Sequence, residues 1–380
     1  MANQLGIIGY DFVEFYVGSA KMWAYWHAKA MGLEITGYSG PETGVKDRVS
    51  YYLTRNNIKF VITSAAKPTN YEVSSFIQKH GDGVKRWSLK VKDVKAAYDA
   101  ALKNGAVPVK TPKKYADDSG YVEEAAIKLY DDAEIVFINR DNYKGVFRPG
   151  FGQPIQKICI NTVETGLQDV DHIVGNVRIN EMNLWENYLN KSLNFETFIE
   201  FGAGDISTQY SALLSKVVRS KDGAPVKNPI NEPFEGMKKS QIEEYIDEYQ
   251  GSGIQHIAIT TDNIIETIRA LRENGMEFLS VPGTYYDILK EKSNAKITGF
   301  PKITENIDDL KKYGILCDTE GKGYLLQLFT KPIGDRPTFF YEIIQRREGA
   351  EGFGQGNFQS LFESIERDQQ LRGNFDKEEN

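Results

Sequence analysis

Cysteine is scarce in this chain, because Cys159 and Cys317 are the only two among 380 residues. Two cysteines cannot build the disulfide framework of a small secreted domain, so we expect a reducing compartment, the cytoplasm. Residues 1–6 contain neither the charged nor the apolar region of a signal peptide, and we expect none. An uninterrupted apolar run of about 18 residues, which a membrane span requires, is also missing. We therefore expect no membrane partner.

Positive charge is limited as well, because 46 lysines and arginines face 53 acidic residues, which gives a net charge of −7. A nucleic-acid partner would require a concentrated basic face, so we expect none. Aromatic residues are plentiful, at 12% of the chain. Such side chains supply large buried areas, which is their commoner use, and they also line pockets for aromatic ligands.

The chain repeats itself at a spacing of 170 residues and, more weakly, at a spacing of 160. Each copy begins with a β-rich run, continues with a helix-like pattern of apolar residues, and returns to strand-like sequence. The length of 380 residues favours two domains. The anchors at 170 are Gly83–Arg86 with Gly253–His256, Gly105 with Gly275, and Pro112 with Pro282; those at 160 are Asp11 with Asp171, Val17 with Val177, Met22 with Met182, and Leu33 with Leu193.

Four such units in two domains predict an α+β fold built of paired βαβββ modules. Pro149, Gly150, Gly152 and Pro154 interrupt residues 147–156, which we interpret as the linker. We therefore expect an N-terminal domain at 1–148 and a C-terminal domain at 157–380. Three prolines favour a long loop over residues 220–237, and a glycine-rich run at 349–356 precedes a last helix at 357–369.

Two of the four histidines stand at equivalent places in the repeat. His172 and His256 each lie in the first strand of a C-terminal module. If the symmetry of the modules brings these strands together, both rings reach one concave sheet, as a shared metal ion requires. A lone histidine is more often structural or exposed, and we assign that role to His27 and His80.

Glu342 is the one carboxylate in the apolar, strand-like run at 338–345. A buried carboxylate without a partner is costly, and metal coordination would remove that cost. Two histidines and one carboxylate form the facial triad of non-haem Fe(II) oxygenases. All three ligands are missing together from the first domain, which we interpret as structural. The repeat places Phe12, Arg86 and Val136 at the positions of His172, His256 and Glu342.

Several runs in the second half of the chain carry the motifs of a known family: Gly253–Ala258, Phe278–Pro282, Thr284–Tyr286, Leu325–Pro332, Asp335–Pro337, Glu342–Arg346 and Gly352–Phe358. They resemble the 4-hydroxyphenylpyruvate dioxygenase family, and the resemblance extends from about residue 18 to residue 372. It implies the fold of the vicinal oxygen chelate (glyoxalase-like) superfamily. It also implies Fe(II) bound by His172, His256 and Glu342, and a homodimer or homotetramer.

The resemblance further implies a substrate pocket. Taken singly, Gln241 is more typical of a solvent-exposed position on a helix, and Phe340 is more typical of a residue in the hydrophobic core. The last helix, which is implied to be a lid, would otherwise pass for an ordinary packed terminal helix. The implied catalytic and polar set is Ser211, Asn231, Gln241 and Gln255; Phe340 and Phe358 would sandwich the substrate ring; and Pro229, Gln327, Phe329 and Asn357 would complete the substrate contacts.

An enzyme of this family converts 4-hydroxyphenylpyruvate and O₂ to homogentisate and CO₂, in tyrosine and phenylalanine catabolism. Hydroxymandelate synthase shares the fold, triad and substrate but hydroxylates the side chain. Pro229, Asn231 and Phe358 resemble the ring-hydroxylating pattern more closely. Two further alternatives are an extradiol dioxygenase, whose substrate is a catechol, and a metal-free binding protein of the same superfamily. The metal-free protein would not need all three ligands.

Overall fold

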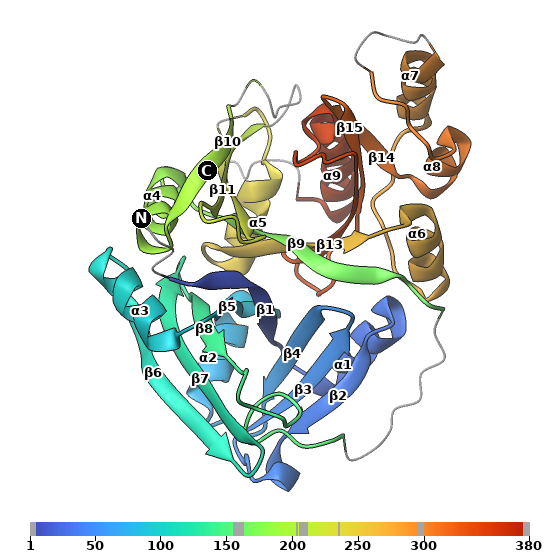
Figure 1. Cartoon of the computed structure of the whole chain (residues 1–380). Coiled ribbons are helices and arrows are strands. Elements are labelled where there is room, and N and C mark those ends of the chain that lie inside the picture. The colour runs from blue at the N-terminus through green and yellow to red at the C-terminus, as the bar shows by residue number, and fades with distance from the viewer. Residues whose placement is uncertain are drawn as a thin grey trace.

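The computed structural model describes residues 5–154, 163–202, 204, 212–234, 236–294 and 300–374. Its strands form two eight-stranded mixed sheets, one from each half of the chain (Figure 1). The first sheet has the strand order β2 (Glu34–Ser39), β3 (Arg48–Arg55), β4 (Ile58–Ala65), β1 (Ile7–Tyr16), β5 (Gly83–Val91), β8 (Ala133–Asn139), β7 (Gly120–Leu129) and β6 (Pro108–Asp117).

The second sheet repeats this order eight strands later: β10 (Phe195–Phe201), β11 (Ala212–Ser220), β12 (Lys227–Phe234), β9 (Leu167–Asn176), β13 (Gly253–Thr261), β16 (Phe340–Arg347), β15 (Gly323–Phe329) and β14 (Leu316–Glu320). In each sheet the two central strands are antiparallel to each other and parallel to their outer neighbours. The predicted fold of paired βαβββ modules is therefore confirmed. The exact domain boundaries stay a prediction, because residues 155–162 lie outside the described part of the chain.

One helix follows the first strand of each module: α1 (Ala20–Met31), α3 (Val94–Lys103), α4 (Met182–Ser192) and α6 (Ile264–Glu273). The start of α6 is fixed by Asn263, whose side chain accepts a hydrogen bond from the backbone of Glu266. Just beyond its end, Gly275 has a φ of 100°, the left-handed conformation expected from the sequence. Helices α2 (Tyr71–His80) and α5 (Gln241–Tyr249) join the modules of each half.

The fourth module contains two helices that the sequence patterns did not predict, α7 (Gly283–Asn294) and α8 (Ile307–Tyr313). They lie between α6 and β14, at the outer edge of the second sheet (Figure 1). None of the helices in the described ranges is both long and apolar enough to cross a membrane.

The expected loop over residues 220–237 is wrong, because β12 occupies residues 227–234 of it. Proline lacks a backbone N–H and normally disfavours an inner strand. Here β12 pairs with β11 along its whole length but with β9 only at Ile230 and Asn231. Pro229 and Pro233 fall outside that short contact, so the missing donors remove few hydrogen bonds.

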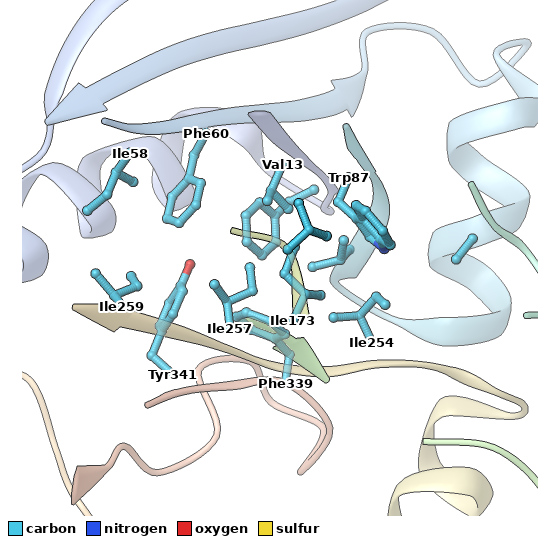
Figure 2. Packing of buried hydrophobic residues seen from close by; sticks show 14 of the residues in the cluster. Val13, Ile58, Phe60, Trp87, Ile173, Ile254, Ile257, Ile259, Phe339 and Tyr341 are labelled. Atoms are coloured by element: carbon cyan, nitrogen blue, oxygen red, sulfur yellow. The ribbon is translucent and has the colours of Figure 1, made fainter. Parts of the chain in front are cut away.

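The two sheets pack against each other through one shared hydrophobic core (Figure 2). Phe60 and Trp87 of the first sheet face Ile257 and Tyr341 of the second, and all four are buried. Side chains alternate between the two faces of a strand. Since Tyr341 points into this core, its neighbour Glu342 points to the opposite, concave face of the second sheet.

The last helix, α9 (Phe358–Arg372), follows a short 3₁₀ turn at residues 355–357. It extends three residues beyond the predicted end and stops at Gly373, whose φ is 78°. Arg372, in its final turn, pairs with the buried carboxylate of Glu244 on α5 at 2.8 Å. This ion pair fixes the end of α9 against the second domain.

Candidate metal centre and substrate cavity

Three buried side chains converge on the concave face of the second sheet. His172 comes from β9, His256 from β13 and Glu342 from β16, and their ligand atoms all lie within 4.8 Å of one another. Ala258 of β13 is paired with His172 on one side and with Glu342 on the other. Its small side chain leaves space between the two larger ones, and His256, two residues earlier, lies on the same face.

The donor atoms of this triad point toward one another. The Nε2 atom of His172 lies 3.1 Å from Oε2 of Glu342, and the Nε2 atom of His256 lies 3.4 Å from the same oxygen. These three residues are between 2% and 8% exposed. Two imidazole nitrogens and a carboxylate oxygen suit a divalent transition metal, so the residues present fit such an ion.

A β-bulge precedes each histidine. The pairing of β9 with β13 has one extra residue at Asp171 and another at Gln255. The bulge turns each of these side chains toward the ring that follows it. As a result Nδ1 of His172 contacts Oδ2 of Asp171 at 2.7 Å, and Nδ1 of His256 contacts Oε1 of Gln255 at 2.9 Å. A proton held at Nδ1 leaves Nε2 free as a metal ligand.

The electrostatics of the triad favour a charged carboxylate. Burial alone would raise the pKa of Glu342, but His172 and His256 outweigh it and lower that pKa to about 2. Burial lowers the pKa of His256, and the neighbouring carboxylate offsets this only in part. At neutral pH the site therefore presents a negative charge and at least one neutral imidazole, as metal coordination requires.

A cavity lies over the triad, with about 590 Å³ of space that includes its opening to solvent. Its walls come from β9 to β13, β15 and β16, from the first residue of α5, and from α9, which covers one side. Phe340 is stacked on the ring of His256, with 4.8 Å between the centroids. The lining is mainly apolar and aromatic: Val174, Phe201, Leu213, Val217, Pro229, Phe329, Phe340, Phe353, Phe358, Leu361, Phe362 and Ile365, with Ser215, Asn231, Gln241 and Gln255 as polar groups beside the triad.

Comparisons with known proteins agree with this geometry. Residues 1–149 match the model described as "Hydroxyphenylpyruvate dioxygenase, HPPD, N-terminal", and residues 171–290 match that of the glyoxalase/bleomycin resistance protein/dioxygenase superfamily. The chain is 44% identical to 4-hydroxyphenylpyruvate dioxygenase of Yarrowia lipolytica, over 96% of this chain and 93% of the relative. It is 43% identical to the enzyme of that name from Dictyostelium discoideum, over 96% and 99%. The chain belongs to the 4-hydroxyphenylpyruvate dioxygenase family.

A solved structure supports the fold of this 4-hydroxyphenylpyruvate dioxygenase family member. A variant of 4-hydroxymandelate synthase from Streptomyces coelicolor superposes with a TM-score of 0.82, covering 96% of this chain and 99% of its own. The two sequences are 24% identical, so this similarity concerns the fold alone.

Most of the pocket residues predicted from the resemblance to the dioxygenase family line the cavity. Ser211 lies outside the described residues. Gln327 and Asn357 are completely buried and do not line the cavity, so their contact with substrate stays a prediction. Asn357 accepts a hydrogen bond from Tyr285 at 2.7 Å, at the start of α9. The predicted residues that do line the cavity are Pro229, Asn231, Gln241, Gln255, Phe329, Phe340 and Phe358.

Sequence reasoning missed two residues beside the triad of this family member. Asp171 contacts His172, and the ring of Phe353 lies edge-on to the same histidine with 4.9 Å between centroids. The repeat did single out Asp171 as the partner of Asp11, but the bulge that aims it at a ligand leaves no pattern in the sequence. Phe353 lies within the glycine-rich run at 349–356, for which the sequence predicts only that it precedes the last helix.

The other two histidines have structural positions, as predicted. Nε2 of His27 contacts the hydroxyl of Tyr341 at 2.7 Å, and Nδ1 of His80 contacts the backbone oxygen of Tyr249 at 2.6 Å. Both contacts join the first half of the chain to the second. Both rings are fully buried and far in sequence from their partners.

Proposed function

We propose that this chain is an Fe(II)-dependent 4-hydroxyphenylpyruvate dioxygenase, which converts 4-hydroxyphenylpyruvate and O₂ to homogentisate and CO₂ in tyrosine and phenylalanine catabolism. The supporting observation is the buried set of His172, His256 and Glu342 beneath an aromatic cavity, in a member of the family of that name. In the reaction the keto acid loses its carboxyl carbon as CO₂, and the remainder gains both atoms of O₂. The ring is hydroxylated and the side chain migrates to the neighbouring carbon.

The triad is suited to Fe(II), because two histidines and one carboxylate occupy one face of an ion and leave the other face open. Bound Fe(II) would supply open positions for the 2-keto acid and for O₂. The substrate carries its own keto acid, so a separate 2-oxo acid is not needed.

The protein's own task is to orient the ring and exclude water. Phe340 on β16 and Phe358 on α9 both line the cavity, and they would hold the substrate ring between them. Asn231 and Gln241 line the cavity and would hold its polar groups, and Gln255 contacts the ring of His256. The apolar side of α9, which lines the cavity, would cover the bound substrate.

We also propose that the protein works in the cytoplasm as a homodimer or homotetramer. Cys317 supports the first part, because it is a buried free thiol in a chain with only one other cysteine. Light scattering of the purified protein would give the oligomeric state, and a single species of monomer mass would contradict the second part.

Product analysis tests the proposed reaction. The purified protein, loaded with Fe(II) without air, is mixed with 4-hydroxyphenylpyruvate and O₂, and the products are separated by chromatography. We expect homogentisate and CO₂ in equal amounts to the O₂ consumed. 4-Hydroxymandelate as the main product would show side-chain hydroxylation instead, and unchanged substrate would contradict the proposal.

A further inference from the structure

Asp171 and Arg346 form a buried ion pair beside the metal ligand His172. While Oδ2 of Asp171 accepts from Nδ1 of His172, the same carboxylate accepts two hydrogen bonds from Arg346. Nε of Arg346 donates to Oδ1 at 2.9 Å, and Nη2 donates to Oδ2 at 2.7 Å. The side chain of Arg346 is only 16% exposed and that of Asp171 only 10%. A guanidinium that binds both oxygens of a buried carboxylate holds it in one orientation.

The remaining nitrogen of Arg346 reaches the segment that leads to α9. Nη1 donates to the backbone oxygen of Gly352 at 2.7 Å and to that of Ala350 at 3.3 Å. The next residue, Phe353, places its ring against His172, and the Arg346 guanidinium lies 5.7 Å from the centre of that ring. One planar group therefore contacts both the carboxylate that holds His172 and the backbone that carries Phe353 into the cavity.

The first domain contains a twin of this arrangement without a metal ligand. Nη2 of Arg140 donates to both oxygens of Asp11, at 2.7 and 3.0 Å. Phe12 stands in the place of His172, and the ring of Phe147 lies edge-on to it with 5.2 Å between centroids. Asp11 and Phe12 precede Asp171 and His172 by 160 positions. Arg140 and Phe147 precede Arg346 and Phe353 by 206 positions.

The twin separates what the fold needs from what the site adds. An aspartate–arginine pair occurs in both domains, so the pair alone is a structural feature. Only the second domain adds a histidine on the carboxylate and donation from the arginine to the backbone of the following segment. In the first domain Nε of Arg140 finds no hydrogen-bond partner among the described residues.

We propose that Asp171 and Arg346 are positioning residues that link the orientation of His172 to the closure of the cavity by residues 350–372. Asp171 would hold the proton of His172 at Nδ1 and keep Nε2 directed at the metal. Arg346 would hold Asp171 in place only while Gly352 and Phe353 are docked. This inference rests on the proposed function only in placing a metal ion on His172. Because coupling between two sites is reciprocal, metal binding should also stabilise the docked segment.

The first test compares Asp171→Asn with its twin Asp11→Asn, with Co(II) alone as the probe. Binding is followed by titration calorimetry and by the visible absorption of the bound ion, which reports its ligand geometry. Loss of such a partner typically weakens metal binding by about 10–100-fold, and we expect this for Asp171→Asn with an altered spectrum. Asp11→Asn should leave both readouts unchanged. Equal effects of the two variants, or no effect of Asp171→Asn, would overturn the proposal.

The second test measures hydrogen exchange of the backbone amides in residues 350–372, with and without Co(II). In the wild-type protein we expect the metal to slow this exchange. Arg346→Lys keeps the charge but cannot bind both oxygens of Asp171 and the backbone together, so the metal-dependent slowing should be lost. Arg140→Lys is the matched control and should retain it. Equal slowing in the wild-type protein and Arg346→Lys would show that the arginine does not link the two.

The two tests do not depend on the reaction catalysed. A protein that binds Co(II) with these differences but makes no homogentisate would refute the proposed function and leave the inference standing. A wild-type protein that does not bind Co(II) would overturn the inference. If Arg346→Lys fails to fold, hydrogen exchange of residues 350–372 in Asp171→Asn and Asp11→Asn decides the link: the slowing by Co(II) should be lost in the first variant and kept in the second, and equal slowing in both would overturn it.

Discussion

At the scale of single residues, the site depends on a buried negative charge placed between two imidazoles. His172, His256 and Glu342 are almost fully buried, and burying any one of them without the other two would cost free energy. We expect His172→Ala, His256→Ala and Glu342→Ala each to abolish Fe(II) binding and turnover. Metal analysis after gel filtration, together with homogentisate formation, measures this.

The matched control for these ligand variants is Glu134→Gln. Glu134 is a buried carboxylate of β8, the strand of the first sheet that corresponds to β16, and it pairs with Arg86. It should retain full metal content. A ligand variant that kept one Fe(II) per chain and normal turnover would remove that residue from the site.

Ring placement is also decided by single side chains. Phe358 lines the cavity and packs edge-on against Phe201, with 5.2 Å between centroids. Phe358→Ile removes an aromatic contact worth roughly 0.5–1.5 kcal/mol beyond burial, enough to change product ratios several-fold to about tenfold. We expect less homogentisate and some side-chain-hydroxylated or uncoupled product by chromatography. An unchanged rate with homogentisate as sole product would show that Phe358 does not orient the ring.

At the scale of elements, we expect α9 to shield the cavity from water. Phe362 packs in one cluster with Phe201, Leu213 and Ile242, while Phe358 and Leu361 also face the cavity. Ending the chain at Gly356 removes α9 but keeps the acceptors of Arg346. We expect metal binding to persist, and O₂ consumption to exceed homogentisate formation, measured with an oxygen electrode and chromatography.

A milder variant serves where the shortened chain does not fold. Arg372→Ala removes the ion pair with Glu244 at the end of α9, and we expect a smaller excess of O₂ consumption. One homogentisate for each O₂ in both variants would mean that α9 does not protect the site.

The sequence predicted elements well where a repeat or a periodic pattern marked them. The structure confirms that Phe12 corresponds to His172. Ser88 and Ala258 are equivalent in the repeat at 170; the Ser88 hydroxyl forms hydrogen bonds with the backbone of Phe12, and Ala258 pairs with His172. Strand β12 was missed because Pro229 and Pro233 suggested a loop, although both lie outside the short part of β12 that pairs with β9. The bulges at Asp171 and Gln255 were also missed, because one extra residue in a strand changes pairing without changing composition.

At the scale of the whole molecule, the two domains are joined by one core, in which His27 is buried. Burial lowers the pKa of His27 to about 4, from an ordinary value of 6.5, and the hydrogen bond to Trp23 offsets this only in part. Between these two values the unfolded chain binds a proton that the folded protein excludes. The contribution of His27 to the free energy of unfolding is therefore fully present above about pH 6.5 and is lost as the pH drops to about 4, by an amount on the order of 3 kcal/mol.

Urea unfolding of the metal-free protein between pH 7 and about pH 4 checks this contribution. His27→Gln has no proton to gain, so its free energy of unfolding should fall less over this range than that of the wild-type protein. Identical pH dependence of the two proteins would contradict a buried, neutral His27. The comparison is independent of the metal site.

The proposed reaction requires that the second sheet hold Fe(II) between two histidines and a carboxylate. A crystal of the protein loaded with Fe(II) under nitrogen, measured at the iron absorption edge, tests it most directly. We predict one anomalous peak per chain, roughly 2.0–2.3 Å from Nε2 of His172, Nε2 of His256 and an oxygen of Glu342, with none near Phe12, Arg86 and Val136. Iron at another place, or bound without one of these three residues, would contradict the claim.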